Sequence, residues 1–285
     1  MSDVFTKTDE VDNRPKKGVV VIYSFLVATL NFIAVVFGYQ FFVGVISYLL
    51  GYETHFYFGR IVSQPFMDEY WSNNRVIVMY AIPPLAFLSA AVFLLSRLLP
   101  KKTAINRIEF YLFWLIVFLV FFVTTQMTTA PISLYYRDSQ LYQGLPVLIY
   151  WFRLPILSSV VLFCLALAIN LLAGYFIYPL LLKLAHTEYC SEDRPWKGKV
   201  VRLYFVYPLL LVLIVAIILG YMYSLAYFLV MLLSSFLWGF GMWLKDIHMY
   251  RYEGISTNRL SIEIGYKLPV LVCVLVILIR IFLAK

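Results

Sequence analysis

Long apolar runs separated by short polar segments dominate the chain. Seven of them are long and apolar enough to suggest membrane helices. Their approximate bounds are 18–38, 75–99, 108–130, 148 or 153 to 182, 201–221, 223–244 and 268–283. This pattern predicts an all-α, polytopic integral membrane bundle of about seven transmembrane helices. The count is six if the last run, which is short, lies on the membrane instead of crossing it.

The first run is longer than one crossing requires. Apolar residues continue from Gly18 almost to Gly51, or roughly 50 Å as one helix against a hydrocarbon core of ~30 Å. We therefore expect a bend or break at Gly38-Tyr39-Gln40, with a bent continuation over 41–50. Prolines inside other runs, such as Pro83-Pro84 and Pro179, predict further kinks.

The domain organisation follows from these runs. Residues 1–17 form a polar arm, and 18–285 form a single transmembrane domain. The basic residues before Gly18 resemble the start of a secretory signal, but no small-residue cleavage site ends the run, so a retained anchor is expected. An external loop is predicted at 51–75, and cytoplasmic loops at 100–107, 183–200 and 245–267.

Composition and charge support a membrane protein. Hydrophobic residues make up 63% of the chain and charged residues 13%, too few charges to cover a soluble surface. The net charge of +8 does not indicate nucleic-acid binding, because the cations cluster between apolar runs, as cytoplasmic loops do. The seven-span arrangement places 17 of the 23 lysines and arginines inside; the others are Arg60, Arg75, Arg137, Arg153, Arg280 and Lys285. A cytoplasmic amino terminus in a bacterial cytoplasmic (inner) membrane is expected.

The loop at 51–75 is the largest polar segment outside the basic loops. Its charged residues and many aromatics suit a segment at the level of the lipid headgroups. They form the predicted external binding surface, which comprises Glu53, His55, Arg60, Asp68 and Glu69. A structural lid of paired charges is the favoured alternative to a ligand site.

Two amides are the predicted polar positions inside the membrane. Gln126 lies among threonines near the end of the third run, and Asn170 lies deep in the fourth. Such groups are more often hydrogen bonds between helices than parts of a polar path. Packing is therefore the preferred interpretation, and a path for a solute the alternative.

Two octets are nearly identical. Tyr-Phe-Ile-Tyr-Pro-Leu-Leu-Leu begins at Tyr175 and Tyr-Phe-Val-Tyr-Pro-Leu-Leu-Leu at Tyr204, on either side of a charged segment. They predict a hairpin of adjacent antiparallel helices, with Pro179 and Pro208 at similar depth. Paired interruptions of this kind can mark a repeat in transporters, but a chance repeat in so aromatic a chain is the preferred explanation.

Residues that carry catalytic or metal chemistry are scarce. The chain contains no zinc-binding His-Glu-x-x-His helix, phosphate-binding glycine loop or serine nucleophile elbow. His186 and Cys190 are four residues apart, but structural zinc needs four protein ligands. The three cysteines are widely spaced and predict no disulfide framework. No cofactor or metal is expected, and an enzyme is less favoured than a non-catalytic protein.

Three functional classes remain. The favoured one is a scaffold or accessory subunit of a membrane complex, in contact with the bilayer and with other membrane chains. The second is a transporter or channel for a small solute that uses Gln126 and Asn170. The third is an enzyme acting on a lipid or polyprenyl headgroup at the outer interface, with residues of the 51–75 loop as acid, base and phosphate ligand.

Overall fold

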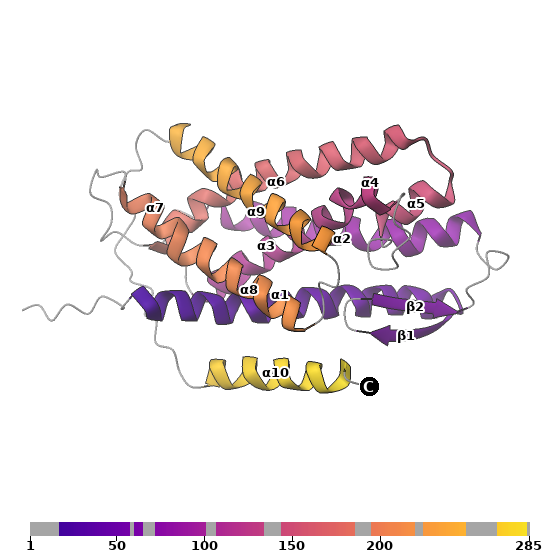
Figure 1. Cartoon of the computed structure of the whole chain (residues 1–285), viewed down its shortest axis with the longest axis horizontal. Helices are drawn as coiled ribbons and strands as arrows, with labels where there is room; N and C mark the ends of the chain where they lie inside the picture. The colour runs from indigo at the N-terminus through magenta and orange to yellow at the C-terminus, as the bar shows by residue number, and fades with distance from the viewer. Residues whose placement is uncertain are drawn as a thin grey trace, which may run out of the picture.

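The computed structural model describes residues 17–57, 60–64, 72–100, 107–133, 144–185, 195–219, 225–248 and 267–283. Helices make up nearly all of these ranges (Figure 1). The long helices are α1 (Lys17–Leu49), α2 (Asn73–Leu98), α3 (Arg107–Thr128), α6 (Ile156–Ala185), α8 (Tyr207–Ile218), α9 (Leu225–His248) and α10 (Lys267–Leu283). The shorter elements are β1 (Glu53–Tyr57), β2 (Arg60–Gln64), α4 (Ala130–Ser133), α5 (Leu145–Trp151), α7 (Pro195–Val201) and the π-helical turn η3 (Arg202–Val206).

Six of the described helical segments are long and apolar enough to cross a membrane. They are Gly18–Leu49, Asn73–Leu98, Arg107–Ile132, Ile156–Lys183, Gly198–Ile218 and Phe228–Ile247. The chain is an integral, multi-pass membrane protein, and the predicted helical membrane bundle is confirmed. The last apolar run forms the shorter helix α10, which lies beside α1 at the edge of the bundle (Figure 1). The number of long apolar helices agrees with the six-span alternative.

The first run has no break at Gly38, so residues 41–49 continue the same helix, as the favoured continuation predicts. Helix α1 continues without a break through Gly38 to Leu49 (Figure 1). The ring of Tyr39 packs against Phe87 and Phe122, with centroids 5.4 and 4.7 Å away, and holds the chain on its helical path. A helical glycine costs about 1 kcal/mol, and two aromatic contacts of roughly 0.5–1.5 kcal/mol each can offset that cost.

The loop at 51–75 contains a β-hairpin that the apolar pattern did not predict. Strands β1 and β2 pair antiparallel, with Glu53 opposite Gln64 and Tyr57 opposite Arg60. Both strands lie along the carboxyl-terminal part of α1 (Figure 1). An isolated two-stranded hairpin is marginally stable, so α1 provides the surface that supports it.

The entry to the hairpin is tied to α2. The buried residue Tyr52 precedes β1, and its hydroxyl accepts a hydrogen bond from Arg75 Nη1 at 3.1 Å. The Arg75 guanidinium also lies 5.5 Å from the centre of the Tyr52 ring. One arginine at the start of α2 thus holds the end of α1 and the beginning of the hairpin together.

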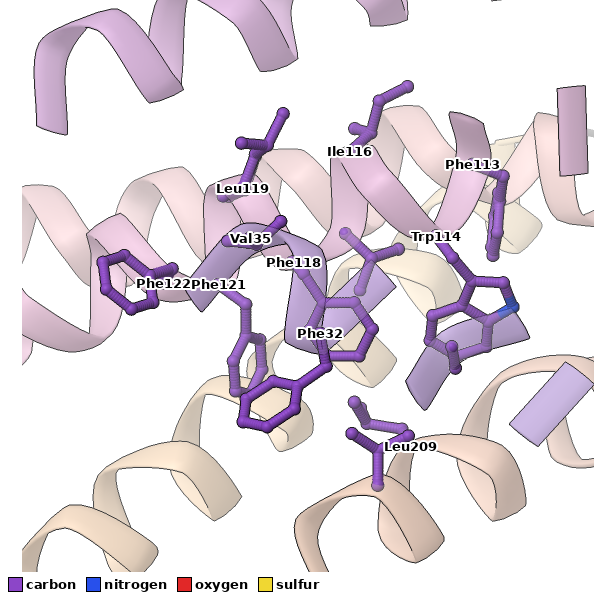
Figure 2. Close-up of a cluster of buried hydrophobic side chains, with 14 of the residues drawn as sticks. Phe32, Val35, Phe113, Trp114, Ile116, Phe118, Leu119, Phe121, Phe122 and Leu209 are labelled. Carbon is purple, nitrogen blue, oxygen red and sulfur yellow. The ribbon is translucent and has the colours of Figure 1, made fainter. Parts of the chain in front are cut away.

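Helix α3 is the centre of the bundle, because α1, α2 and α6 all pack against it. Most of its residues are buried, including Phe113, Trp114 and Phe118 (Figure 2). The indole of Trp114 is stacked on Phe205 of η3, and Phe205 is stacked on Trp238 of α9, each pair with centroids 5.8 Å apart. This ring stack links three elements that are far apart in sequence.

The two octets have different structures. The first is part of the continuous helix α6, whereas the second passes from η3 into α8. Tyr178 is 2% exposed, but its counterpart Tyr207 is 45% exposed. Helix α8 packs mainly against α1, and α6 contacts α7 and η3. Matching positions therefore have different environments, which argues against a structural repeat.

Candidate functional site: a buried polar network between α3, α6 and α9

Asn170 is the centre of a polar network in the middle of the bundle. Its side-chain oxygen Oδ1 accepts hydrogen bonds from Trp238 Nε1 at 2.8 Å and from Thr124 Oγ1 at 3.0 Å. Its amide nitrogen donates to the carbonyl of Ala166 at 2.9 Å and is 3.4 Å from Ser234 Oγ. Asn170 is completely buried. One amide on α6 thus connects α3 to α9.

Two glycines explain how α6 and α9 come close enough for this network. A Cβ atom at Gly174 would collide with the backbone of Trp238, and one at Gly241 would collide with the backbone of Leu171. Each helix therefore places a glycine against the backbone of the other. Small residues allow such close approach in membranes, where helices gain little from apolar burial alone.

The threonines at the end of α3 bond mainly to their own helix. Thr125 donates to the carbonyl of Phe121 at 2.6 Å, and Thr128 donates to that of Thr124 at 2.7 Å. Thr129 donates to the carbonyl of Gln126 at 2.8 Å. These hydroxyls are buried and already donate to backbone carbonyls of their own helix. This arrangement is typical of packed helices rather than of side chains that line a polar path.

Gln126 differs from Asn170. It is 4% exposed, and its oxygen Oε1 has no hydrogen-bond partner among the residues that the structure describes. This oxygen lies against Gly144, where a Cβ atom would collide with it. Gly144 has a φ of 64° and precedes α5, which packs against α2. A positive φ favours glycine, so this residue both makes the turn and leaves room for Gln126.

A second polar cluster lies where α6 and α9 end. Tyr178 donates a hydrogen bond to Asp246 at 2.8 Å. The ammonium of Lys245 is 3.4 Å from the Tyr175 hydroxyl and 4.4 Å from the centre of its ring. The tyrosines of the first octet therefore hold the two charged residues near the end of α9.

A buried lysine completes the same end of the bundle. The Lys183 ammonium donates to the carbonyl of Leu99, just after α2, at 3.0 Å. Glu109 in the first turn of α3 is also buried and interacts electrostatically with Lys183. A buried cation and a buried carboxylate near one another offset part of the cost of removing each charge from water.

Another hydrogen-bonded chain satisfies the backbone around Pro208. Proline has no N–H, so residue 208 cannot donate to the carbonyl of Tyr204, its usual helical partner. The hydroxyl of Ser24 in α1 donates to that carbonyl at 2.8 Å, and the indole of Trp114 is 3.2 Å from Ser24 Oγ. Helices α1 and α3 thus supply the donors at the point where η3 passes into α8.

The structure tests little of the predicted external surface. Glu53, His55 and Arg60 belong to the strands of the hairpin. Asp68 and Glu69 lie outside the described residues, as do His186 and Cys190. No group of three or more His, Cys, Asp or Glu residues in the described ranges could hold a metal ion.

Four residues of the network were missed from the sequence: Ser234, Trp238, Gly174 and Gly241. For Gly174 and Gly241 the available signal was a glycine inside a long apolar run, which does not say which helix is the partner. Searches against protein-family models, curated proteins and solved structures found no match to the chain.

Proposed function

We propose that this protein is a non-catalytic scaffold or accessory subunit of a membrane complex. The observation that carries the proposal is the bonding of Asn170, whose oxygen and amide nitrogen are both occupied by neighbouring groups of the bundle. A polar path needs side chains that can exchange their partners with a passing solute or ion. This amide is instead fully buried and joins α3, α6 and α9 into one unit.

The proposed setting is a bacterial inner membrane with the amino terminus in the cytoplasm. Lys17 begins α1, Arg97 is in the last turn of α2, and Lys183 is near the end of α6. These ends gather on one side of the bundle (Figure 1). A concentration of cations on one side supports a cytoplasmic face there. The proposed partners are other membrane chains, and nucleic acid is not among them.

Isolation of intact complexes tests the scaffold proposal. The tagged chain is extracted with mild detergent from its own membrane after brief cross-linking, and the bound proteins are identified and quantified. We expect at least one other membrane protein at a constant ratio to the chain. Recovery of the chain alone at every cross-linker dose would contradict the proposal.

The same preparation compares Asn170→Leu with Asn31→Leu. The Asn31 amide donates to the carbonyl of Val27 in its own helix, so Asn31→Leu is a matched control. Under the scaffold proposal, Asn170→Leu lowers thermal stability, and whatever folds retains the partner. A stable Asn170→Leu protein that binds its partner but abolishes the cellular phenotype would instead point to chemistry or transport at this amide.

A transporter or channel is the second candidate, because the buried Gln126 oxygen has no partner in the described part of the chain. A solute with a hydrogen-bond donor could donate to this oxygen. Replacement with leucine separates the candidates. Under the scaffold proposal, Gln126→Leu leaves function intact and can increase stability, since it removes an unsatisfied buried group. Under the transport alternative, the variant folds but loses solute flux in proteoliposomes.

A further inference from the structure

Helix α10 is apolar on every side. Its stretch Leu268–Ile279 contains no charged residue, and the thiol of Cys273 is its only side chain with a polar hydrogen. A helix that lies flat on a membrane keeps a polar face toward water and buries the apolar one. On α10 the large side chains that the bundle leaves 45–57% exposed are themselves apolar: Val270, Leu271, Val274, Ile277 and Leu278. Water is therefore an unfavourable neighbour for this face.

The opposite face of α10 packs against the bundle along most of the helix. Val272 and Ile279 are buried, and Leu268, Leu275 and Val276 are partly buried against the hydrophobic core. These positions recur every three or four residues, so they lie on one side of the helix. The contact begins in the first turn and continues for about three turns.

Helix α10 also runs in the direction of a membrane span. It packs beside α1, and the two helices begin at the same end of the bundle (Figure 1). Helix α1 contains one of the six long apolar segments. A helix on the membrane surface lies in the plane of the interface and would cross the ends of the spans instead.

The length and the charged ends of α10 suit a short crossing. Its 17 residues extend about 25 Å, which is a few ångströms less than a hydrocarbon core of ~30 Å. A bilayer can become thinner around a short span at modest cost. Lys267 begins the helix and Arg280 belongs to its last turn, so the charges lie at its two ends.

We infer that α10 is a seventh membrane span whose outward face contacts lipid chains. The six long helical segments return the chain to the side from which it started, and α10 then crosses once more. Residues before α1 and residues after α10 therefore lie on opposite sides of the membrane. Arg280 is then placed away from the cation-rich end of the bundle, so packing on α1 outweighs the usual distribution of cations. This inference goes beyond the scaffold role and holds for either orientation of the chain.

Labelling of single cysteines in spheroplasts tests the crossing. Lys285→Cys, Asn74→Cys and Pro100→Cys are each made in a background in which the three natural cysteines are serine. Asn74 and Pro100 are exposed at the two ends of α2 and mark the two sides of the membrane. With a membrane-impermeant maleimide, Lys285→Cys should react like Asn74→Cys and unlike Pro100→Cys, relative to permeabilised samples. A Lys285→Cys protein that reacts like Pro100→Cys would overturn the inference.

Charges in the middle of α10 distinguish a span from a surface helix. Val274 and Ile277 are exposed, so Val274→Lys with Ile277→Lys leaves the packing on α1 in place. In a span, both ammonium groups would lie in hydrocarbon, which is unfavourable. The doubly charged helix should fail to cross, and the share of Lys285→Cys that reacts on the Asn74 side should fall at least fivefold. Leucine at both positions is the control and should leave labelling unchanged. Unchanged labelling in the lysine variant would also contradict a crossing.

Discussion

The α1–α3 contact and the α6–α9 contact achieve close packing in opposite ways. Large rings fill the first: Tyr23 stacks on Phe110 at 5.6 Å, and Phe32 meets Phe118 edge-on at 5.7 Å. The second depends on two glycines that bring the backbones together around the Asn170 network. Large side chains fill the space between α1 and α3, whereas the lack of side chains at the two glycines lets the backbones of α6 and α9 touch.

This difference shows what each contact can tolerate. An aromatic contact can lose one ring and retain its neighbours, at the cost of a cavity. A backbone contact has no side chain that can move aside when an atom is added. Substitutions in each contact should therefore differ in their cost to the free energy of unfolding.

Truncation of a central ring should have the largest effect. Trp114 is fully buried and stacked between other aromatics, so Trp114→Ala should lower the free energy of unfolding by about 3–5 kcal/mol. Phe93→Ala is the control, because Phe93 is 57% exposed on α2. Reversible unfolding in mixed micelles measures both. An equal decrease in the free energy of unfolding for the two variants would show that burial of the ring in α3 does not determine the loss of stability.

Addition of one methyl group at the glycine contact should cost somewhat less. Gly174→Ala places a Cβ against the backbone of Trp238 and should destabilise the protein by about 2 kcal/mol. Gly239→Ala should instead be neutral or stabilise the protein by up to about 1 kcal/mol, because a Cβ atom there meets no described atom within 4 Å. The same unfolding assay gives both values. A stabilised Gly174→Ala protein would show that α6 and α9 are not in backbone contact.

Removal of the central amide should have a smaller effect. Asn170→Leu leaves Trp238 Nε1 without its acceptor and should cost about 1–2 kcal/mol. Asn31→Leu should cost less, because Asn31 bonds within its own helix. The Trp238 fluorescence maximum should also move as its hydrogen bond is lost, measured in a protein with the other tryptophans replaced by phenylalanine. An unchanged spectrum would contradict the bond.

The smallest effect concerns a single hydroxyl. Ser24→Ala removes the donor to the Tyr204 carbonyl and should cost about 1 kcal/mol. Ser159→Ala is a suitable control, because Ser159 is equally buried but donates to Ile156 in its own helix. Amide exchange around η3 should rise only in the Ser24 variant. Identical exchange in both variants would show that Ser24 does not hold this turn.

The sequence predicted the helices well, because run length and composition alone identify a membrane helix. It also favoured packing for Asn170, in agreement with the observed bonds. It could not predict that α6 and α9 pair, because helices that are apolar on every side show no face that marks a neighbour. The hairpin was missed for a related reason, since its short strands lie in a loop without a clear apolar alternation.

The absence of a break at Gly38 has a different cause. A glycine and a polar pair in a helix are a local signal for a break, but Tyr39 packs on two rings from α2 and α3 that are distant in sequence. Tertiary contacts thus outweighed a local preference. Gln126 illustrates the same limit of local patterns, because one cluster of polar residues contains both occupied threonines and an oxygen with no described partner.

The bond between Ser24 and Tyr204 also bears on how the protein is made. Helix α1 is synthesised long before the segment with Pro208, so the Ser24 hydroxyl is in place when that later segment enters the bilayer. Lipid cannot donate a hydrogen bond to a carbonyl that proline leaves open. We therefore expect the late helix to satisfy this carbonyl when it docks on the first one, so that α1 guides the placement of a segment made much later.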